Sequence, residues 1–359
     1  MNESGWSGRE MKESNASGSS ETDPSSIAEL DLALINALQI HSRASWALIG
    51  QVLDISAVTA ARRWDRLASE GVAWITAYGG PAMWEHNCLA FVEVDCEAAS
   101  TSAVAAAMAA DPYAASVEYT AGGANLFVTT AISNLTALSA YVRDRVSMLD
   151  GVIATRVHLA TRVYTEASRW QLRSLTKEQR AMLAQDVATP GSEGILRKED
   201  QPLLIALGVD GRRSNAGLAD DLGISASTVR RRLQRMIRAD VVRFRCDVAS
   251  IYTQWPVLVS YQAVCSPSQV DVVGRALASL PEVRVCVAAL GANNILFTVW
   301  LRSASSSLAL ELELSKRLPQ MTITNRAVTL HSVKRFGRLL DDHGRGVGVV
   351  PMDIWHKVE

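Results

Sequence analysis

The sequence predicts an α+β protein with two winged helix-turn-helix domains and two ferredoxin-like βαββαβ domains, arranged as a tandem repeat. Residues 30–74 align with residues 199–243 at a constant offset of 169, and sixteen of the 45 aligned positions are identical. Each aligned segment has the spacing of three short helices and is followed by alternating strand-like and helix-like segments. The same offset joins Cys96 to Cys265 and Gly122 to Gly291, so one repeat unit contains both kinds of domain.

The composition is typical of a globular protein. Hydrophobic residues make up 48% and charged residues 20% of the 359 residues. No apolar run reaches the roughly 20 residues that a membrane helix requires, and residues 1–26 lack the basic start and apolar core of a secretory signal. We therefore expect a cytoplasmic protein with no membrane partner. The five cysteines form no C-x-x-C pair, which favours buried free thiols over a metal site.

The repeat divides the chain into consecutive segments. We expect a disordered tail over 1–26, winged helix-turn-helix domains over 27–80 and 198–250, ferredoxin-like domains over 85–165 and 255–335, a linker over 166–197 and a C-terminal tail over 336–359. In the linker, Thr176 and Gln179 form a capping box that opens a helix to about Val187. In the tail, Gly344–Gly348 predicts a flexible segment, because it lacks the strand and helix of a phosphate-binding loop, and Val349–Trp355 is apolar enough to dock.

The second helical segment has the order of a winged helix-turn-helix domain. Leucines at helical spacing end at the turn Asp210-Gly211-Arg212, Ser214 caps a short helix, and Gly223 suits the left-handed residue after it. Ser225 caps a third helix with apolar residues at a period of 3.6. A β-rich stretch, Val241–Phe244, follows this helix, which in such domains enters the DNA major groove.

The third helix is strongly basic in the second copy. No acidic residue interrupts Ser225–Arg238, whereas Asp65 and Glu70 dilute the charge of the first copy, in which Trp64 is expected to fill the core. A basic helix face neutralises phosphates, so we expect double-stranded DNA as a partner. The candidate DNA-binding residues are Ser56, Thr59, Arg62, Arg63, Arg66, Ser225, Ser227, Thr228, Arg230, Arg231, Arg232 and Arg235. Arg232 and Arg235 are expected mainly to contact the DNA backbone or to hold the helix itself in place.

The rest of each repeat predicts a βαββαβ unit. In the first copy we expect strands over 89–94, 115–120, 125–131 and 152–163 with helices over 98–110 and 135–146. The second copy predicts strands over 257–264, 282–289, 294–301 and 322–333 with helices over 269–279 and 305–317. Helices cover one face of such a sheet, so its other face needs a partner sheet, within the chain or in a homodimer or higher homo-oligomer.

The ordered motifs resemble the Lrp/AsnC family of transcription factors over about residues 27–165 and 198–335. The motifs are Leu30-Asp31, the turn at Gly211, Leu222–Ser225 leading to Arg232 and Arg235, Gly71-Val72, and the glycine between the second and third strands. The resemblance implies specific DNA binding, dimerisation through the sheets and an amino-acid-like effector near the glycine loops. The implied effector residues are Gly122, Gly123, Asn125, Gly291, Asn293 and Asn294. Family members commonly have aspartate where this chain has Asn125 and Asn294, so a different effector, or none, is also compatible with the sequence.

The sequence predicts no enzyme, no catalytic residue and no cofactor. It has no G-x-S-x-G or H-E-x-x-H motif, and its six histidines are scattered. Two alternatives stay open. One is an enzyme similar to siroheme decarboxylases, which are built from fused Lrp-like halves, with His86, Arg156, His158 and His331 as candidate pocket residues. The other is a ligand sensor that does not bind DNA. The basic helix of the second copy argues against both.

Overall fold

A computed structural model describes residues 27–84, 87–167, 171–185, 194–253 and 255–356. The expected tail over 1–26 lies outside the described residues. Within those ranges, no helix is both long and apolar enough to cross a membrane. All five cysteines are free thiols, and all except Cys88 are buried.

Two three-helix modules form as the repeat predicts. The first contains α1 (Glu29–Ile40), α2 (Trp46–Leu53) and α3 (Ala57–Ser69), and the second contains α8 (Gln201–Val209), α9 (Asn215–Leu222) and α10 (Ala226–Arg238). The hydroxyls of Ser45, Ser56, Ser214 and Ser225 accept hydrogen bonds from backbone N–H groups of the helices that they precede. Gly223 has the expected positive φ of 63°, and Asp54 has the same conformation at the equivalent position.

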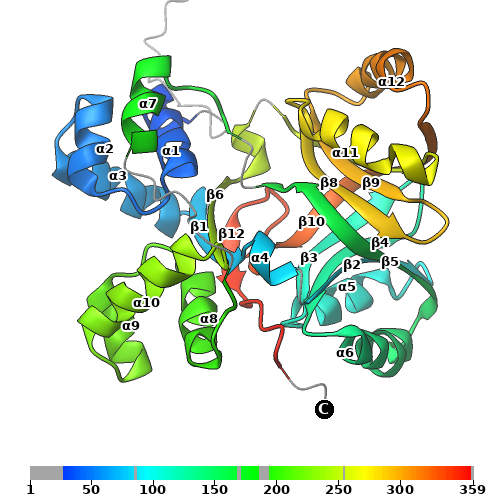
Figure 1. Ribbon diagram of the computed structural model, residues 1–359, viewed down its shortest axis with the longest axis horizontal. Helices are drawn as coiled ribbons and strands as arrows, with labels where there is room; N and C mark the ends of the chain where they lie inside the picture. Colours follow the sequence, from blue (N-terminus) through cyan, green and yellow to red (C-terminus); the bar gives the residue numbers. More distant parts are fainter. Residues whose placement is uncertain (1–26, 85–86, 168–170, 186–193, 254, 357–359) are drawn as a thin grey trace, which may run out of the picture.

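The strand that follows each module pairs with the strand of the other module. Strands β1 (Ala73–Gly79) and β6 (Val242–Val248) are antiparallel, with Thr76 opposite Arg245. Each module therefore contributes one strand to a shared two-stranded ribbon. A strand alone would leave its backbone N–H and C=O groups without hydrogen-bond partners, and the strand of the other module supplies these partners. Figure 1 shows this ribbon between the two helical modules and the larger sheet.

The linker helix α7 (Lys177–Gln185) belongs to the first module. The capping box is confirmed: Thr176 and Gln179 exchange hydrogen bonds of 3.0 and 3.2 Å. Leu183 is fully buried in the core of the first module, and the Asn36 carboxamide oxygen accepts hydrogen bonds from two backbone N–H groups of the segment before α7. The expected end of this helix near Val187 lies outside the described residues.

Two βαββαβ units follow the predicted order closely. The first unit contains β2 (Cys88–Cys96), α5 (Thr101–Ala109), β3 (Ala114–Ala121), β4 (Leu126–Ile132), α6 (Leu135–Ala140) and β5 (Val152–Thr165). The second contains β7 (Val257–Val264), α11 (Val270–Ala278), β8 (Val283–Leu290), β9 (Ile295–Leu301), α12 (Ser306–Arg317) and β10 (Thr322–Arg335). The single helix expected over 135–146 is broken, because a π turn and a 3-10 turn continue α6 to Met148.

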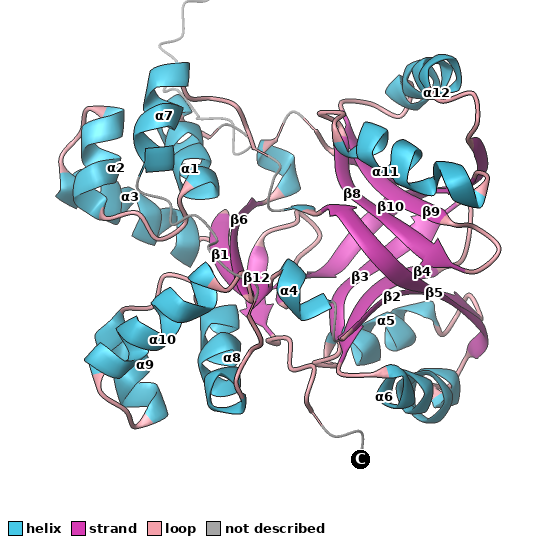
Figure 2. Ribbon diagram, viewed as in Figure 1, coloured by secondary structure: helices cyan, strands magenta, loops and turns pink. Residues whose placement is uncertain are grey.

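The two sheets close on each other as a barrel. Hydrogen-bonded neighbours run β3-β4-β2-β5-β8-β9-β7-β10, and β10 also pairs with β3. The long strands β5 and β10 make this possible, because the first half of each pairs within its own unit and the second half pairs with the other unit. Figure 2 shows helices on the two outer sides of these strands. The closed arrangement covers the inner sheet faces within one chain.

A pseudo-twofold axis relates the two halves. Leu159 of the first half pairs with Leu290 of the second half. The residues at the equivalent repeat positions, Val328 and Ala121, pair with each other in the same way. Residues that lie 169 apart and contact each other must face each other across this axis. Thr76 with Arg245 in the ribbon, and Glu93 with Gln262 in the barrel, meet this condition. The axis therefore passes through both the ribbon and the barrel interior.

The C-terminal tail contains a β-hairpin and an apolar end that packs on the second module. Strands β11 (Arg338–Leu340) and β12 (Gly346–Val349) form a hairpin whose Gly346 N–H donates to Gly71 O at 2.8 Å. The prediction of a flexible segment over Gly344–Gly348 is therefore wrong, because strand pairing and the contact with the first module hold it. Docking of the apolar end is confirmed, since Ile354 is buried in the core of the second module.

Candidate nucleic-acid interface and barrel interior

Helix α10 turns its basic side outward. Its Val229, Leu233 and Met236 are buried in the module core, which leaves Ser227, Arg230, Arg231 and Arg238 exposed. The Ser225 hydroxyl accepts a hydrogen bond from the Thr228 N–H at 3.2 Å and so fixes the start of the helix. Ser227, Arg230 and Arg231 lie in its first two turns, and in helix-turn-helix domains the N-terminal residues of the recognition helix contact base edges.

Two further arginines of α10 are engaged inside the module. Arg235 forms an ion pair with Asp200, whose side chain is buried, and Arg232 donates from Nη1 to Glu199 O at 2.8 Å. These contacts hold α10 against the start of α8. The predicted DNA-binding residues therefore separate into an exposed set and a set that positions the helix.

The first module repeats this arrangement with fewer exposed cations. Arg63 donates from Nη1 to Asp31 Oδ1 at 2.9 Å, and Arg66 pairs with the other oxygen of the same buried carboxylate. Arg62 remains exposed, and Ser56 lies 2.8 Å from Thr59 between hydroxyl oxygens. Val58, at the position of Ser227, is 78% exposed. Trp64 is buried in the core, as predicted.

Two arginines clamp the modules together. Arg212 donates to Ser42 O at 2.7 Å and Ala44 O at 2.9 Å, while Arg43 donates to Gly211 O and Arg213 O. The two sets of contacts are related by the pseudo-twofold axis. The two arginines occupy equivalent positions of the repeat, 169 residues apart, and the sequence predicted no role for them because neither lies on a recognition helix.

The glycine loops connect the halves of the barrel. Gly122 and Gly291 have φ values of 94° and 144°. A Cβ at Gly122 would lie 2.6 Å from Arg326 O, on the long strand of the other half, so only glycine permits this approach. Gly123 lies in the same turn and faces the Asn325 amide.

The asparagines of these loops bind their own half. Asn125 Oδ1 accepts a hydrogen bond from Cys96 N–H at 2.8 Å, and Asn294 Oδ1 accepts one from Cys265 N–H at 3.1 Å. These amides therefore tie each loop to the end of the strand beside it. Asn293 donates to Gln262 Oε1 at 2.7 Å, inside the barrel mouth.

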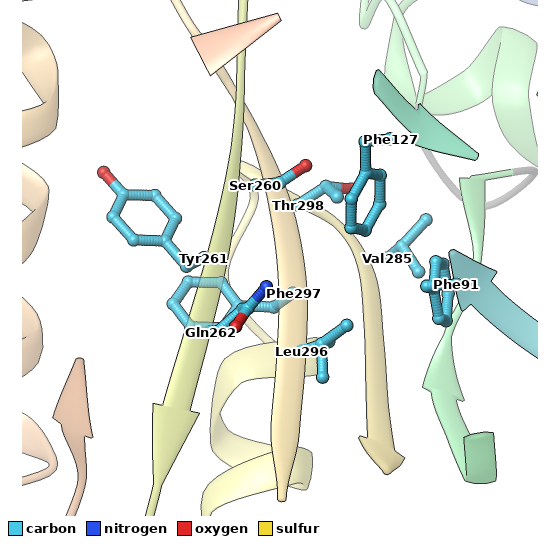
Figure 3. Close-up of a pocket in the computed structure, with 9 residues that line it drawn as sticks. All are labelled: Phe91, Phe127, Ser260, Tyr261, Gln262, Val285, Leu296, Phe297 and Thr298. Carbon is cyan, nitrogen blue, oxygen red and sulfur yellow. The ribbon is translucent and has the colours of Figure 1, made fainter. Parts of the chain in front are cut away.

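The middle of the barrel is apolar. Phe91 and Phe127 stack with ring centroids 5.7 Å apart, and Figure 3 shows them facing Val285, Leu296 and Thr298 of the other half. Phe91, Phe127 and Leu296 belong to one buried hydrophobic cluster, against which Val285 packs. The apolar contact joins the halves and separates two polar ends of the barrel interior.

The end near the glycine loops contains a buried carboxylate. Glu93 Oε2 accepts a hydrogen bond from Arg156 Nε at 2.8 Å and lies 3.5 Å from His158 Nε2, while Gln262 donates to Oε1. Burial raises the pKa of Glu93, but His158 and Arg156 lower it more strongly, to about 2. The structure thus brings together two candidate pocket residues, Arg156 and His158. His331 lies instead against the Tyr119 ring, and His86 is outside the described residues.

The fold and its exposed basic helices define a helix-turn-helix protein with a paired ferredoxin-like barrel. Residues 28–68 and 199–237 match the AsnC-type helix-turn-helix domain, and residues 89–170 match the Lrp/AsnC ligand binding domain. An uncharacterized HTH-type transcriptional regulator of Pyrococcus furiosus is 31% identical over 144 residues, 40% of this chain and 97% of its own length. One from Pyrococcus abyssi is 30% identical over 38% of this chain and 87% of its own. The chain belongs to the Lrp/AsnC family and contains its DNA-binding domain twice.

A solved structure with both halves in one chain corrects one expectation. The siroheme decarboxylase NirDL, solved in complex with an iron-uroporphyrin III analogue, covers 86% of this chain and 93% of its own, at a TM-score of 0.54 and 16% identity. This likeness shows the fold. The expectation that the chain is not an enzyme is wrong, because a known enzyme has the same two-half fold. That expectation depended on the absence of familiar catalytic motifs. A pocket whose residues are scattered along the sequence contains no such motif.

Proposed function

We propose that this protein is a sequence-specific DNA-binding transcription regulator in which one chain supplies both helix-turn-helix modules of a DNA-binding pair. The observation that carries this proposal is the exposure of α3 and α10 on modules that the ribbon and the Arg43/Arg212 clamp hold in a pseudo-twofold arrangement. Paired recognition helices of this kind bind two half-sites of one DNA duplex.

The two half-sites should differ in sequence. In α10, Ser227, Thr228, Arg230 and Arg231 are placed to reach base edges, whereas α3 offers Ser56, Thr59 and Arg62. Arginine with two donors toward guanine is the most common specific contact in the major groove. The second module should therefore set most of the sequence preference, and Arg63, Arg66, Arg232 and Arg235 should support the helices from behind.

A small-molecule effector and assembly into larger oligomers are further parts of this proposal. The effector would be an amino-acid-like molecule at the loops of Gly122, Gly123 and Asn125 and of Gly291, Asn293 and Asn294, as the family resemblance implies. Support comes from the position of each loop against the long strand of the other half. The paired sheets are already complete within one chain, so any homodimer would form through another surface.

Selection of genomic DNA fragments with the purified full-length chain tests the proposal. We expect an enriched sequence, and an Arg230→Ala/Arg231→Ala double variant should lose most of the preference for it. Arg317→Ala is the matched control, because Arg317 is an exposed arginine on α12 that pairs with Glu313. No enriched sequence, or equal binding by the double variant and the control, would contradict the proposal.

Titration with siroheme supplies the second arm of the test. A regulator has no need for tight stoichiometric tetrapyrrole binding, which is readily seen in the visible spectrum. Such binding together with no retardation of DNA at low salt would replace the proposed regulator with an enzyme of the siroheme decarboxylase kind.

A further inference from the structure

A buried cluster of charges lies at the end of the barrel that faces the ribbon. It contains Arg245 and Asp247 from β6, Arg284 from β8, Arg335 from β10 and Glu118 from β3, all of which are buried. The three arginines outnumber the two carboxylates of the cluster by one, and the half-buried Glu166 acts on Arg245 only weakly from outside the cluster. Burial of an excess charge in a protein interior costs several kcal/mol.

Asp247 satisfies only part of the arginine donors. Its Oδ1 accepts hydrogen bonds from Arg245 Nη2 at 2.5 Å and Arg284 Nη2 at 3.1 Å. Among the residues that the structure describes, buried Arg245 Nη1, Arg284 Nη1 and Arg335 Nη1 have no hydrogen-bond partner. Unpaired buried donors are uncommon in folded proteins and indicate a missing partner.

A cavity of about 50 Å³ is lined by Glu118 and the three arginines of the cluster, together with Phe336 and Trp300. This volume is enough for a few water molecules or one small ion. The Arg284 guanidinium lies 3.6 Å from the centre of the Trp300 ring, and that of Arg245 lies 4.2 Å from the centre of the Phe336 ring. Stacking fixes the guanidinium planes and leaves their edges available, which is the geometry in which arginine binds carboxylate or phosphate.

We propose that this cavity binds a small oxyanion, a carboxylate or a phosphate, through the free N–H groups of Arg245, Arg284 and Arg335. The anion neutralises the excess charge and satisfies the unpaired donors. Its site is distinct from the glycine loops, since Phe91 and Phe127 line the cavity and its lining includes no residue of either loop. The residues 169 positions from the three arginines are Thr76, Ala115 and Glu166, so the pseudo-twofold axis produces no second copy of the site.

The site also connects the barrel to the DNA-binding modules. Arg245 lies in the ribbon opposite Thr76, while Arg284 and Arg335 belong to barrel strands. An anion held by all three arginines stabilises one position of the ribbon relative to the barrel. The role of this anion as an effector rests on the proposed function, whereas the binding of the anion does not.

Glu118 makes the site sensitive to pH. Burial raises the pKa of Glu118 to about 6, although Arg335 and Arg284 act in the opposite direction. Asp247 and Arg245 on β6 are the remaining charged groups of the cluster. Below that pKa the neutral carboxyl can donate a hydrogen bond to an anion, and above it the carboxylate repels the anion. Affinity should therefore fall as pH rises through 6.

Calorimetric titration of the full-length chain with sodium acetate, oxalate or phosphate tests the site, with sodium chloride at equal ionic strength as the reference. We expect saturable binding of one oxyanion per chain, and a rise in melting temperature with its concentration. Glu118→Gln should tighten binding about tenfold or more at pH 7.5 and change it little at pH 5.5. Arg284→Gln should abolish binding, and Arg317→Ala should leave it unchanged.

The two kinds of variant keep the test decisive. If Arg284→Gln does not fold, the opposite effect of Glu118→Gln still decides, because a gain of affinity does not arise from a loss of structure. A response to oxyanions no greater than to chloride, or Glu118→Gln binding with unchanged affinity at pH 7.5, overturns the proposal. Preference for acetate or oxalate identifies a carboxylate ligand, and preference for phosphate identifies a phosphate ligand. DNA binding is measured in parallel with anion binding. If the chain binds the anion but not DNA, only the effector role is rejected.

Discussion

The two halves of this chain share their backbone register but differ in chemistry where they meet. Glu93 contacts Gln262, Thr76 lies opposite Arg245, and an uninterrupted basic helix in the second half matches an acid-diluted one in the first. A symmetric homodimer must place the same residue on both sides of its axis. Joining two copies in one chain removes that restriction, so a carboxylate can face an amide and an arginine can face a threonine without duplicating a charge.

The largest expected difference between the halves is in their response to acid. The pKa of Glu93 is held near 2, below its ordinary value of 4.5, so its contribution to stability is complete above about pH 4.5 and is lost as pH falls toward 2. This contribution amounts to roughly 3 kcal/mol. Glu93→Gln should remove it, so urea unfolding at pH 3 and pH 7 should differ less in the variant than in the parent chain.

Asp144→Asn provides the control for this measurement. Asp144 pairs with Arg143 at the surface, and its loss should leave the acid dependence almost unchanged. An unchanged difference between pH 3 and pH 7 in Glu93→Gln would show that the buried carboxylate is not the origin of the asymmetry.

The second difference concerns the recognition helices. Arg231→Ala should weaken binding to the selected DNA by roughly 1–3 kcal/mol, and Arg62→Ala, at the equivalent position, should cost less. The reason is that Arg231 extends a cluster with Arg230, whereas Arg62 lies near Asp65. Titrations at two salt concentrations check this, because each lost phosphate contact should flatten the salt slope by about 0.9. Equal losses from both variants would show that local charge does not rank the modules.

Local signals in the sequence predicted most of the fold. The offset of 169, the serine caps and the alternation of strands and helices depend on neighbouring residues, and each matches the structure to within a few positions. The barrel closure could not be read in this way, because it depends on β5 and β10 each changing partners at Leu159 and Val328. Nothing local marks such a change.

The candidate sites show the same limit. Exposed Arg230 and Arg231 follow from helical periodicity alone. The engagement of Arg232 and Arg235 with the start of α8 was expected only in outline, and the barrel cluster of Arg245, Arg284 and Arg335 was not found. These arginines come from three strands that are far apart in the sequence, and no spacing rule connects them. An arginine within an otherwise apolar strand, such as Arg284, was the one available signal.

The smallest expected difference concerns the clamp between the modules. Both arginines donate to two carbonyl oxygens, but Arg212 also stacks 3.9 Å above the Trp46 ring, whereas Arg43 is 5.8 Å from the Phe244 ring. Burial, and then the charge of Arg43, lower the pKa of Arg212 to about 10, so Arg212 keeps its proton at neutral pH and the charge of Arg43 acts against it. Arg212→Ala should therefore destabilise the chain by about 0.5–1 kcal/mol more than Arg43→Ala, which is the contribution of the closer stack. Urea unfolding of both variants, with Arg275→Ala as an exposed control, measures this difference. A larger loss in Arg43→Ala would mean that the carbonyl contacts, and not the aromatic ring, determine the strength of the clamp.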